Sequence, residues 1–149
     1  MTCHEWIAEG LRYDSYANRA WLAVMDGATD AERKTFHHIL GASKIWLARM
    51  HGVSMTEPPV VPLTAETIDE LESGWLEALE TAALDQEIAY RNLAGEPYSR
   101  TLADIVRHVV NHSTYHRGQL RESFGQRGAE FPETDFIRYT FARDEILPI

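Results

Sequence analysis

The stretch "TLADIVRHVVNHSTYHRGQLRESFG", residues 101–125, predicts a single long amphipathic helix. Its apolar side chains recur at spacings of three and four along one face, which is the pattern of a helix packed against other helices. Thr101 lies three residues before Asp104, which is the spacing of a capping box, and Gly125 marks the expected end. The apolar face consists of Leu102, Ile105, Val109, Leu120 and Phe124.

The same signals predict three further helices. Thr2 and Thr29 each precede a glutamate by three residues, so each is expected to begin a helix with a capping box. Thr64 is the expected N-cap of a third helix, which follows a proline-rich segment. These helices are expected over residues 3–26, 30–51 and 65–84.

Four helices that each carry one apolar stripe predict an all-α fold, namely a four-helix bundle. The connections 52–64 and 86–100 exceed tight helical turns, so long crossover connections are expected. The sequence Ala-Gly-Glu-Pro at 94–97 reads as a turn and is compatible with a short hairpin between the third and fourth helices. Residues 135–146 are compatible with a last short helix.

Composition narrows the classes of function. The 149 residues predict one domain spanning 1–149, and the net charge of −9 argues against binding to nucleic acid. No apolar run is long enough for a membrane span, so no membrane partner is expected. The single cysteine, Cys3, cannot form an internal disulfide, and the first residues show no signal peptide. A cytoplasmic protein is the resulting expectation.

Histidines are concentrated on two of the expected helices. His108, His112 and His116 are four residues apart, and a helical projection places His116 in the apolar stripe, His112 on its flank and His108 near its rim. On the helix over 30–51, His38 falls within a broad apolar arc, whereas His37 points to the far side. If a third inward histidine comes from this helix, it is therefore His38.

This arrangement suits a metal ion. Two histidines at i and i+4 have Cβ atoms about 5–6 Å apart, which lets both rings reach one ion at about 2.0–2.1 Å. A third ring from a neighbouring helix leaves coordination positions open for water or substrate, as in catalytic sites. The alternative is that these histidines are hydrogen-bonded core residues, and the pattern alone leaves both interpretations open.

Two polar residues, Asp14 and Asn18, interrupt the apolar stripe of the first helix. A buried carboxylate or amide needs a hydrogen-bond partner, and the second N–H of a metal-ligating imidazole is one candidate. The alternative is that Asp14 and Asn18 lie at the edge of the stripe and bond to water or backbone.

Three of these segments resemble motifs of the DinB/YfiT-like family of metalloenzymes. The segment "NHSTYHRGQ", residues 111–119, is similar to that family's fourth-helix motif almost in full. The segment "HILGASKIWLARMHG", residues 38–52, resembles its second-helix motif, and "YDSYAN", residues 13–18, resembles a variant of its first-helix signature. Ser15 and Tyr16 depart from that signature.

The resemblance implies a four-helix bundle with long crossovers, assembled as a homodimer, and a divalent metal held by His38, His112 and His116. His108 fits the family pattern as a non-ligand near the site. Gly118, in the middle of a helix, suggests the close approach of another helix or a subunit. Zn²⁺ or Ni²⁺ is the expected ion, with Fe, Mn or Cu as alternatives.

Characterised relatives of the family include transferases and isomerases that use low-molecular-weight thiols such as bacillithiol or mycothiol. The expected function is therefore that of a metal-dependent enzyme acting on a small-molecule substrate by thiol transfer or isomerisation. The alternatives are a metal-dependent hydrolase and a non-enzymatic, stress-related bundle that binds metal or small ligands. Four residues are candidates for contacting the substrate or for hydrogen bonding to the metal-ligating histidines, namely Asp14, Asn18, Tyr115 and Arg117.

Overall fold

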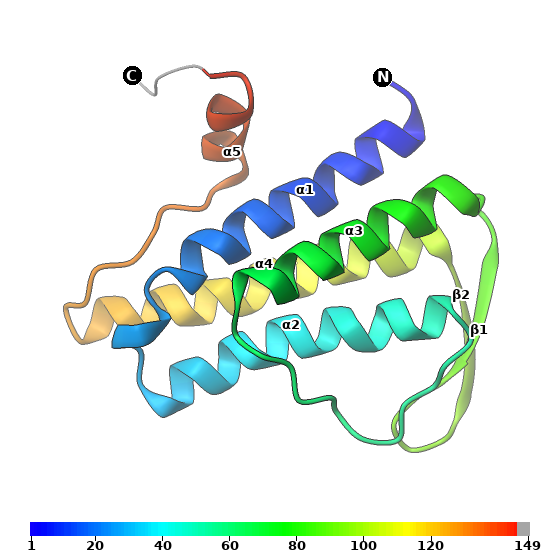
Figure 1. Cartoon of the computed structure of the whole chain (residues 1–149), viewed down its shortest axis with the longest axis horizontal. Helices are drawn as coiled ribbons and strands as arrows, with labels where there is room; N and C mark the ends of the chain where they lie inside the picture. The colour runs from blue at the N-terminus through cyan, green and yellow to red at the C-terminus, as the bar shows by residue number, and fades with distance from the viewer. Residues whose placement is uncertain (146–149) are drawn as a thin grey trace.

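The computed structural model describes residues 1–145, which are mostly helical with one small two-stranded sheet. In Figure 1, the axes of α1 to α4 lie roughly along the long axis of the molecule, with the chain running one way in α1 and α4 and the other way in α2 and α3. α1 and α2 each contact both α3 and α4. The helices are α1 (Cys3–Leu22), α2 (Asp30–Met50), α3 (Ala65–Thr81), α4 (Leu102–Gln126) and α5 (Phe136–Arg143).

The predicted N-caps are confirmed. Thr2 and Thr29 close full capping boxes, and Thr64 and Thr101 each accept a hydrogen bond from the backbone N–H three residues later. Two predicted helix ends are wrong. α1 ends at Leu22 and is followed by a 3-10 turn over Met25–Gly27, because this bend carries Met25 into the core. α3 ends at Thr81, where the backbone becomes extended on the way to the hairpin.

The core consists of large side chains contributed by all four long helices. One cluster is centred on Trp21, Phe36 and Phe124, and a second contains Trp75 and Leu102. Trp21 and Phe124 meet edge to face, with ring centroids 5.4 Å apart, an arrangement that adds to the free energy of burial. This contact joins the end of α1 to the end of α4.

The hairpin between α3 and α4 is present. Strands β1 (Glu87–Arg91) and β2 (Pro97–Thr101) pair antiparallel, and Tyr90 lies opposite Tyr98. Gly95 adopts a φ of +83° in the connecting turn, a conformation that favours glycine. Figure 1 shows the hairpin at the end of the molecule where α2 finishes and α4 begins.

His37 anchors the crossover between α2 and α3. Its Nε2 accepts a hydrogen bond of 3.0 Å from the backbone N–H of Val61, whose side chain is buried. The crossover returns over the side of α2 on which His37 was expected and half-buries the ring, so that side is not open to solvent at His37. His37 is the kind of hydrogen-bonded structural histidine that the alternative interpretation described.

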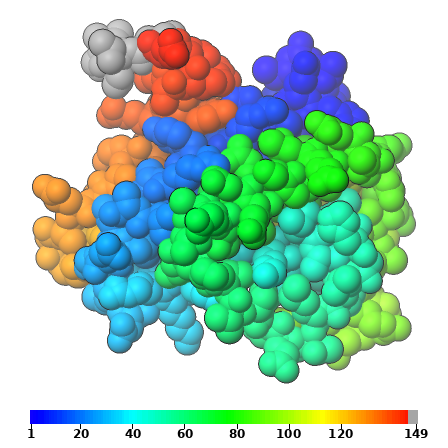
Figure 2. All heavy atoms as spheres, viewed as in Figure 1, coloured from blue at the N-terminus to red at the C-terminus, as the bar shows by residue number. Residues whose placement is uncertain are grey.

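The last helix lies on α1. Glu9 accepts hydrogen bonds from the Tyr139 hydroxyl and from Arg143 of α5, and Tyr13 packs edge to face on Phe136. Figure 2 shows α5 on the surface beside the first turns of α1. The helix expected over 135–146 is thus present as Phe136–Arg143, and residue 146 lies outside the described residues. No helix in 1–145 has the length and apolar character needed to cross a membrane.

Glu32 connects the start of α2 to the end of α4. Its carboxylate is 2% exposed and accepts hydrogen bonds from Arg127 and from the Ser123 hydroxyl. The Arg127 hydrogen bonds, opposed by burial, lower the pKa of Glu32 from 4.5 to about 2. As the pH falls, the unfolded chain therefore takes up the proton first, and the stabilisation is lost between about pH 4.5 and pH 2.

We expect Glu32→Gln to lower the free energy of unfolding at pH 7 by about 2 kcal/mol, because hydrogen bonds to a charged group are weakened. At pH 2.5 the difference between variant and wild type should be much smaller. Urea unfolding at both pH values measures it, and Glu122→Gln, an exposed change on α4, is the control. An equal loss at both pH values would contradict the assigned role of the Glu32 carboxylate.

Candidate metal centre

Three histidines meet between α2 and α4. His112 and His116 lie one turn apart on α4 and are half-buried, whereas His38 on α2 is exposed. The Nε2 atom of His112 lies 3.0 Å from Nε2 of His38 and 3.2 Å from Nε2 of His116. His38 was expected within an apolar arc, but the described neighbours leave its ring open to solvent, so the cluster lies at the surface.

These separations fit a shared ion. Two nitrogens that each lie about 2.0–2.1 Å from one ion are about 2.9–3.4 Å apart for octahedral to tetrahedral angles. The three candidate ligand atoms all lie within 4.8 Å of one another. The widest separation that two ligands can have is about 4.2 Å, so a small rotation of the exposed His38 ring is enough to complete the set. His38, His112 and His116 can therefore hold a divalent ion and leave its solvent side open.

The charge state of the cluster also suits a metal. Burial and the neighbouring imidazoles lower the pKa of His112 to about 4, and burial lowers the pKa of His38. Both rings are therefore neutral at pH 7, and a neutral imidazole carries the lone pair that a metal requires.

Gln119 orients one of these rings. Its Oε1 lies 2.7 Å from Nδ1 of His116, and an amide oxygen only accepts, so the proton of His116 is on Nδ1. The lone pair of His116 is then on Nε2, the atom that faces His112. Gln119 is three residues after His116 on the same helix, and this spacing is the sequence signal for its role.

We expect Gln119→Leu to weaken metal binding 10- to 100-fold, because the tautomer and orientation of His116 are no longer fixed. Competition with a chelating dye measures the dissociation constant. Gln126→Leu, a change of the same residue type at the end of α4, is the control. An unchanged dissociation constant for Gln119→Leu would contradict this positioning role.

A sequence model of the DinB family matches residues 20–146, which include all three histidines. The chain belongs to the DinB family. Protein DinB of Bacillus subtilis (strain 168) is 29% identical over 85 residues, which are 52% of this chain and 49% of that protein. The chain thus matches about half the length of this curated relative. Asp14 and Asn18 precede the residues that the DinB model matches.

The other candidate residues of this DinB-family chain lie in two places. Tyr115 is exposed and its ring centroid is 5.1 Å from that of His116, so Tyr115 borders the open side of the metal centre. His108 is also near, with its ring centroid 5.5 Å from that of His112, but it lies outside the group whose nitrogens converge. This agrees with its expected place beside the ligands.

Asp14, Asn18 and Arg117 form a separate buried cluster between α1 and α4. Arg117 donates to Oδ1 of Asp14 at 2.7 Å and to Oδ1 of Asn18 at 2.8 Å, and Asn18 donates to the other Asp14 oxygen. Burial raises the pKa of Asp14, and Arg117 opposes that shift. The two α1 residues therefore bond to each other and to the Arg117 guanidinium, and no imidazole of the described residues is hydrogen-bonded to them.

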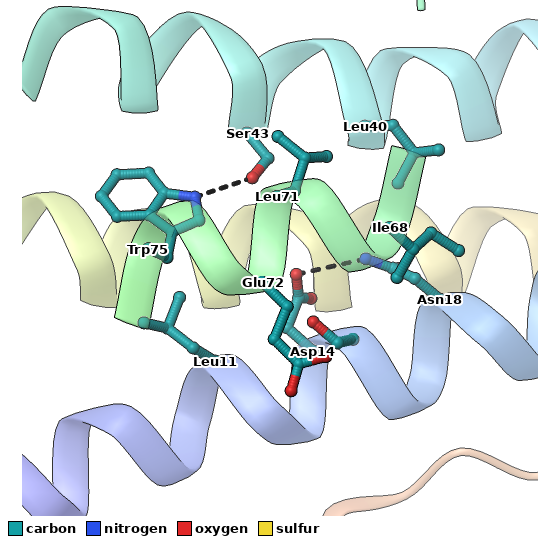
Figure 3. A pocket seen from close by; sticks show the side chains of 10 residues that line it. Leu11, Asp14, Asn18, Leu40, Ser43, Ile68, Leu71, Glu72 and Trp75 are labelled. Atoms are coloured by element: carbon teal, nitrogen blue, oxygen red, sulfur yellow. Dashed lines mark hydrogen bonds between the residues drawn. The ribbon is translucent and has the colours of Figure 1, made fainter. Parts of the chain in front are cut away.

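A small cavity adjoins this polar cluster. Figure 3 shows it between α1, α2 and α3, with Asp14 and Asn18 on one side and the Trp75–Ser43 hydrogen bond on the other. Its volume of about 10 Å³ is close to the minimum that holds one water molecule, so it is too small for a substrate.

Sequence reasoning also missed a cationic residue on the same side of α2 as His38. Arg49 is only 7% exposed and lies over the rings of Trp46 and Tyr90, at 4.3 Å and 4.6 Å from their centroids. The ring of Trp46 in turn contacts that of His108, with centroids 5.3 Å apart. The periodicity of α2 predicts the face of Arg49, but the contact with Tyr90 depends on where the hairpin folds back.

Proposed function

We propose that this protein is a divalent-metal-dependent enzyme that acts on small molecules, with His38, His112 and His116 as the metal ligands. The observation that carries this proposal is the convergence of three imidazoles at an open surface between α2 and α4. We also assign the helical arrangement to a four-helix bundle with two long crossovers, at 51–64 and 82–101, because α1 and α2 each contact both α3 and α4.

The proposed reaction is thiol-dependent S-transfer or isomerisation. A bound divalent ion lowers the pKa of a thiol or water at its open positions, so that a nucleophile is available at neutral pH. His116, fixed by Gln119, presents Nε2 to the ion, and the exposed His38 ring leaves the approach open. Tyr115 borders that approach and can contact or orient the substrate through its ring and hydroxyl. Zn²⁺ or Ni²⁺ suits three imidazoles, as do Fe and Cu.

The alternative is hydrolysis, and the surroundings of the centre favour thiol chemistry over it. Within residues 1–145, no Asp or Glu side chain is hydrogen-bonded to His38, His112 or His116. A hydrolase commonly places such a carboxylate where it can take a proton from water, whereas a thiol brings its own nucleophile. We propose a structural role, rather than a catalytic one, for Asp14, Asn18 and Arg117, because they bond to one another.

Loading the purified protein with Co²⁺ tests the proposal. A thiol that binds the ion adds an intense charge-transfer absorption, and a panel of thiols with electrophilic co-substrates should give both this absorption and turnover. The same titration on His116→Ala should show neither. Absence of both signals in the wild type across the panel would reject thiol chemistry, and ester or amide turnover in its place would establish the hydrolase. Metal binding without any turnover would support a non-enzymatic binding protein.

We also propose that the protein is a homodimer that pairs through the outer face of α1 and α4. A groove of about 740 Å³ between α1, α4 and α5 is lined by apolar and polar side chains, among them Trp6 and Phe136, both of which are exposed. Gly118 continues this face along α4, and a Cβ added there would meet nothing within 4 Å in the described part of the chain. Its absent side chain is therefore not explained by packing within one subunit, and a partner helix would use the space.

We expect Gly118→Arg and Trp6→Arg to convert a dimer to a monomer in sedimentation equilibrium, because each places a charge in the proposed contact. Glu80→Arg, a change of an exposed residue on α3, is the control and should leave the dimer intact. A wild-type protein that is monomeric at tens of micromolar would overturn this assembly.

A further inference from the structure

Arg49 is a buried cation without an acidic partner. Its Nε has no hydrogen-bond partner, and no carboxylate of residues 1–145 lies within salt-bridge distance of the guanidinium. Burying a charge is costly unless it is paired. The other buried arginine of the described chain, Arg117, meets this requirement through Asp14, so Arg49 is the exception.

The aromatic neighbours of Arg49 offset only part of this cost. Trp46 and Tyr90 contact the guanidinium through their ring faces, which attract a cation. Ring faces do not satisfy strong N–H donors, so the donors of Arg49 remain available to an oxygen acceptor. The two rings also hold the planar guanidinium in place, so little side-chain entropy remains to be lost when an anion binds.

Arg49 lies on the same face of α2 as the metal ligand His38. They are eleven residues apart, which is three helical turns and about 16 Å along the axis. Between them, the ring of His108 contacts both Trp46 and His112, with centroid separations of 5.3 Å and 5.5 Å. A continuous row of rings thus joins the three-histidine centre to the guanidinium.

We propose that Arg49 binds a carboxylate group of the small molecule on which the metal centre acts. This inference deepens the proposed function. It rests on that function for the assumption that the other end of the same molecule reacts at the metal. A guanidinium offers two parallel N–H donors to the two oxygens of a carboxylate. The spacing selects an extended molecule about as long as a pentapeptide, with its reactive group at the metal and its carboxylate at Arg49.

The local charge favours a monoanion over a phosphate dianion. Arg49 is in the last turn of α2, where the helix dipole presents its negative end. The rings over the guanidinium belong to the uncharged side chains Trp46 and Tyr90, so no second cation is among these contacts of Arg49. A single guanidinium in this setting matches the charge of one carboxylate.

The first experiment is direct and needs no metal. In proton–nitrogen spectra, the Arg49 Nε–H signal is assigned by its loss in Arg49→Lys, and metal-free protein is titrated with benzoate, phenyl phosphate and benzamide. We expect benzoate to move this signal at millimolar concentration, phenyl phosphate to move it less, and benzamide to leave it unchanged. A signal that benzoate does not move overturns the proposal, and a stronger response to phenyl phosphate replaces the carboxylate with a phosphate ester.

The second experiment separates this inference from the proposed function. Calorimetry on Zn²⁺-loaded protein compares a pentapeptide that has a cysteine at its N-terminus and a free carboxylate at its C-terminus with the same peptide amidated at its C-terminus. We expect wild type to bind the acid at least tenfold more tightly than the amide, and Arg49→Met to remove that preference while binding the amide as before. Arg121→Met, which removes an exposed arginine of α4, should retain it.

The outcomes are distinguishable. Cobalt–thiolate absorption with equal affinity for the acid and the amide would overturn the role of Arg49 and leave the metal-thiol function standing. If benzoate moves the Arg49 signal but no thiol binds the ion, the carboxylate site at Arg49 stands and the metal-thiol function is overturned. Melting temperatures of Arg49→Met and Arg49→Lys establish that both variants are folded before either result is used.

Discussion

Replacing Arg117 with methionine is expected to lower the free energy of unfolding by about 3–5 kcal/mol at pH 7, the largest loss of stability among the changes considered. Arg117 is buried, and its removal leaves the Asp14 carboxylate without its cation between α1 and α4. Burial already raises the pKa of Asp14, and the loss of Arg117 raises it further. The variant should therefore regain stability relative to wild type as the pH falls below 7, because Asp14 becomes neutral in the folded state.

Urea unfolding from pH 5 to pH 8 measures this effect. The double variant Asp14→Asn with Arg117→Met should be more stable than Arg117→Met alone, since no unpaired charge remains buried. Arg121→Met, on the exposed side of α4, is the control and should change stability by less than about 0.5 kcal/mol. A loss below about 1 kcal/mol for Arg117→Met would show that the ion pair is not needed to hold α1 against α4.

Replacing His112 with alanine is expected to weaken metal binding at least 100-fold. This exceeds the loss expected when a residue that only hydrogen-bonds to a ligand is removed. His112 is the central member of the centre, because its Nε2 makes both short contacts to the other two rings. Without it, His38 and His116 offer one ligand from each helix, and no pair remains on a single helix. Metal content after dialysis and the rise in melting temperature with added Zn²⁺ or Ni²⁺ both report the loss.

His108→Ala is the matched control for that experiment. His108 belongs to the same row on α4, but its nitrogens lie outside the convergent group. We expect His108→Ala to retain the metal content and the metal-dependent rise in melting temperature of the wild type. If His112→Ala retains both as well, the three-histidine assignment fails.

The parts of the fold that are encoded locally could be predicted. Each long helix begins at a threonine whose hydroxyl accepts a backbone N–H three residues later, and that signal is contained in four residues of sequence. Helix ends were predicted less well, because they depend on where the chain must turn next. Met25 leaves α1 to enter the core, a requirement that no local pattern expresses.

The candidate site divides in the same way. The sequence predicted that His38, His112 and His116 lie together, from the four-residue spacing on α4 and the helical projection of α2. The structure places their ring nitrogens near one another. The partners of Arg117 could not be predicted, because Asp14 is 103 residues away and the sequence does not distinguish it from other polar residues of α1 as the hydrogen-bond partner. The hydrogen bond of His37 could not be predicted for a similar reason, because its partner Val61 belongs to a crossover without periodicity.

The position of the histidines on two different helices has a further consequence. His38 and His112 are 74 residues apart in sequence, so an ion that both bind is a reversible cross-link closing a large loop of the chain. Such a cross-link stabilises the folded state by RT ln(1 + [M]/Kd), or about 2.7 kcal/mol when free metal exceeds Kd by a hundredfold. The survival of this protein against proteolysis would then rise and fall with the metal supply of the cell.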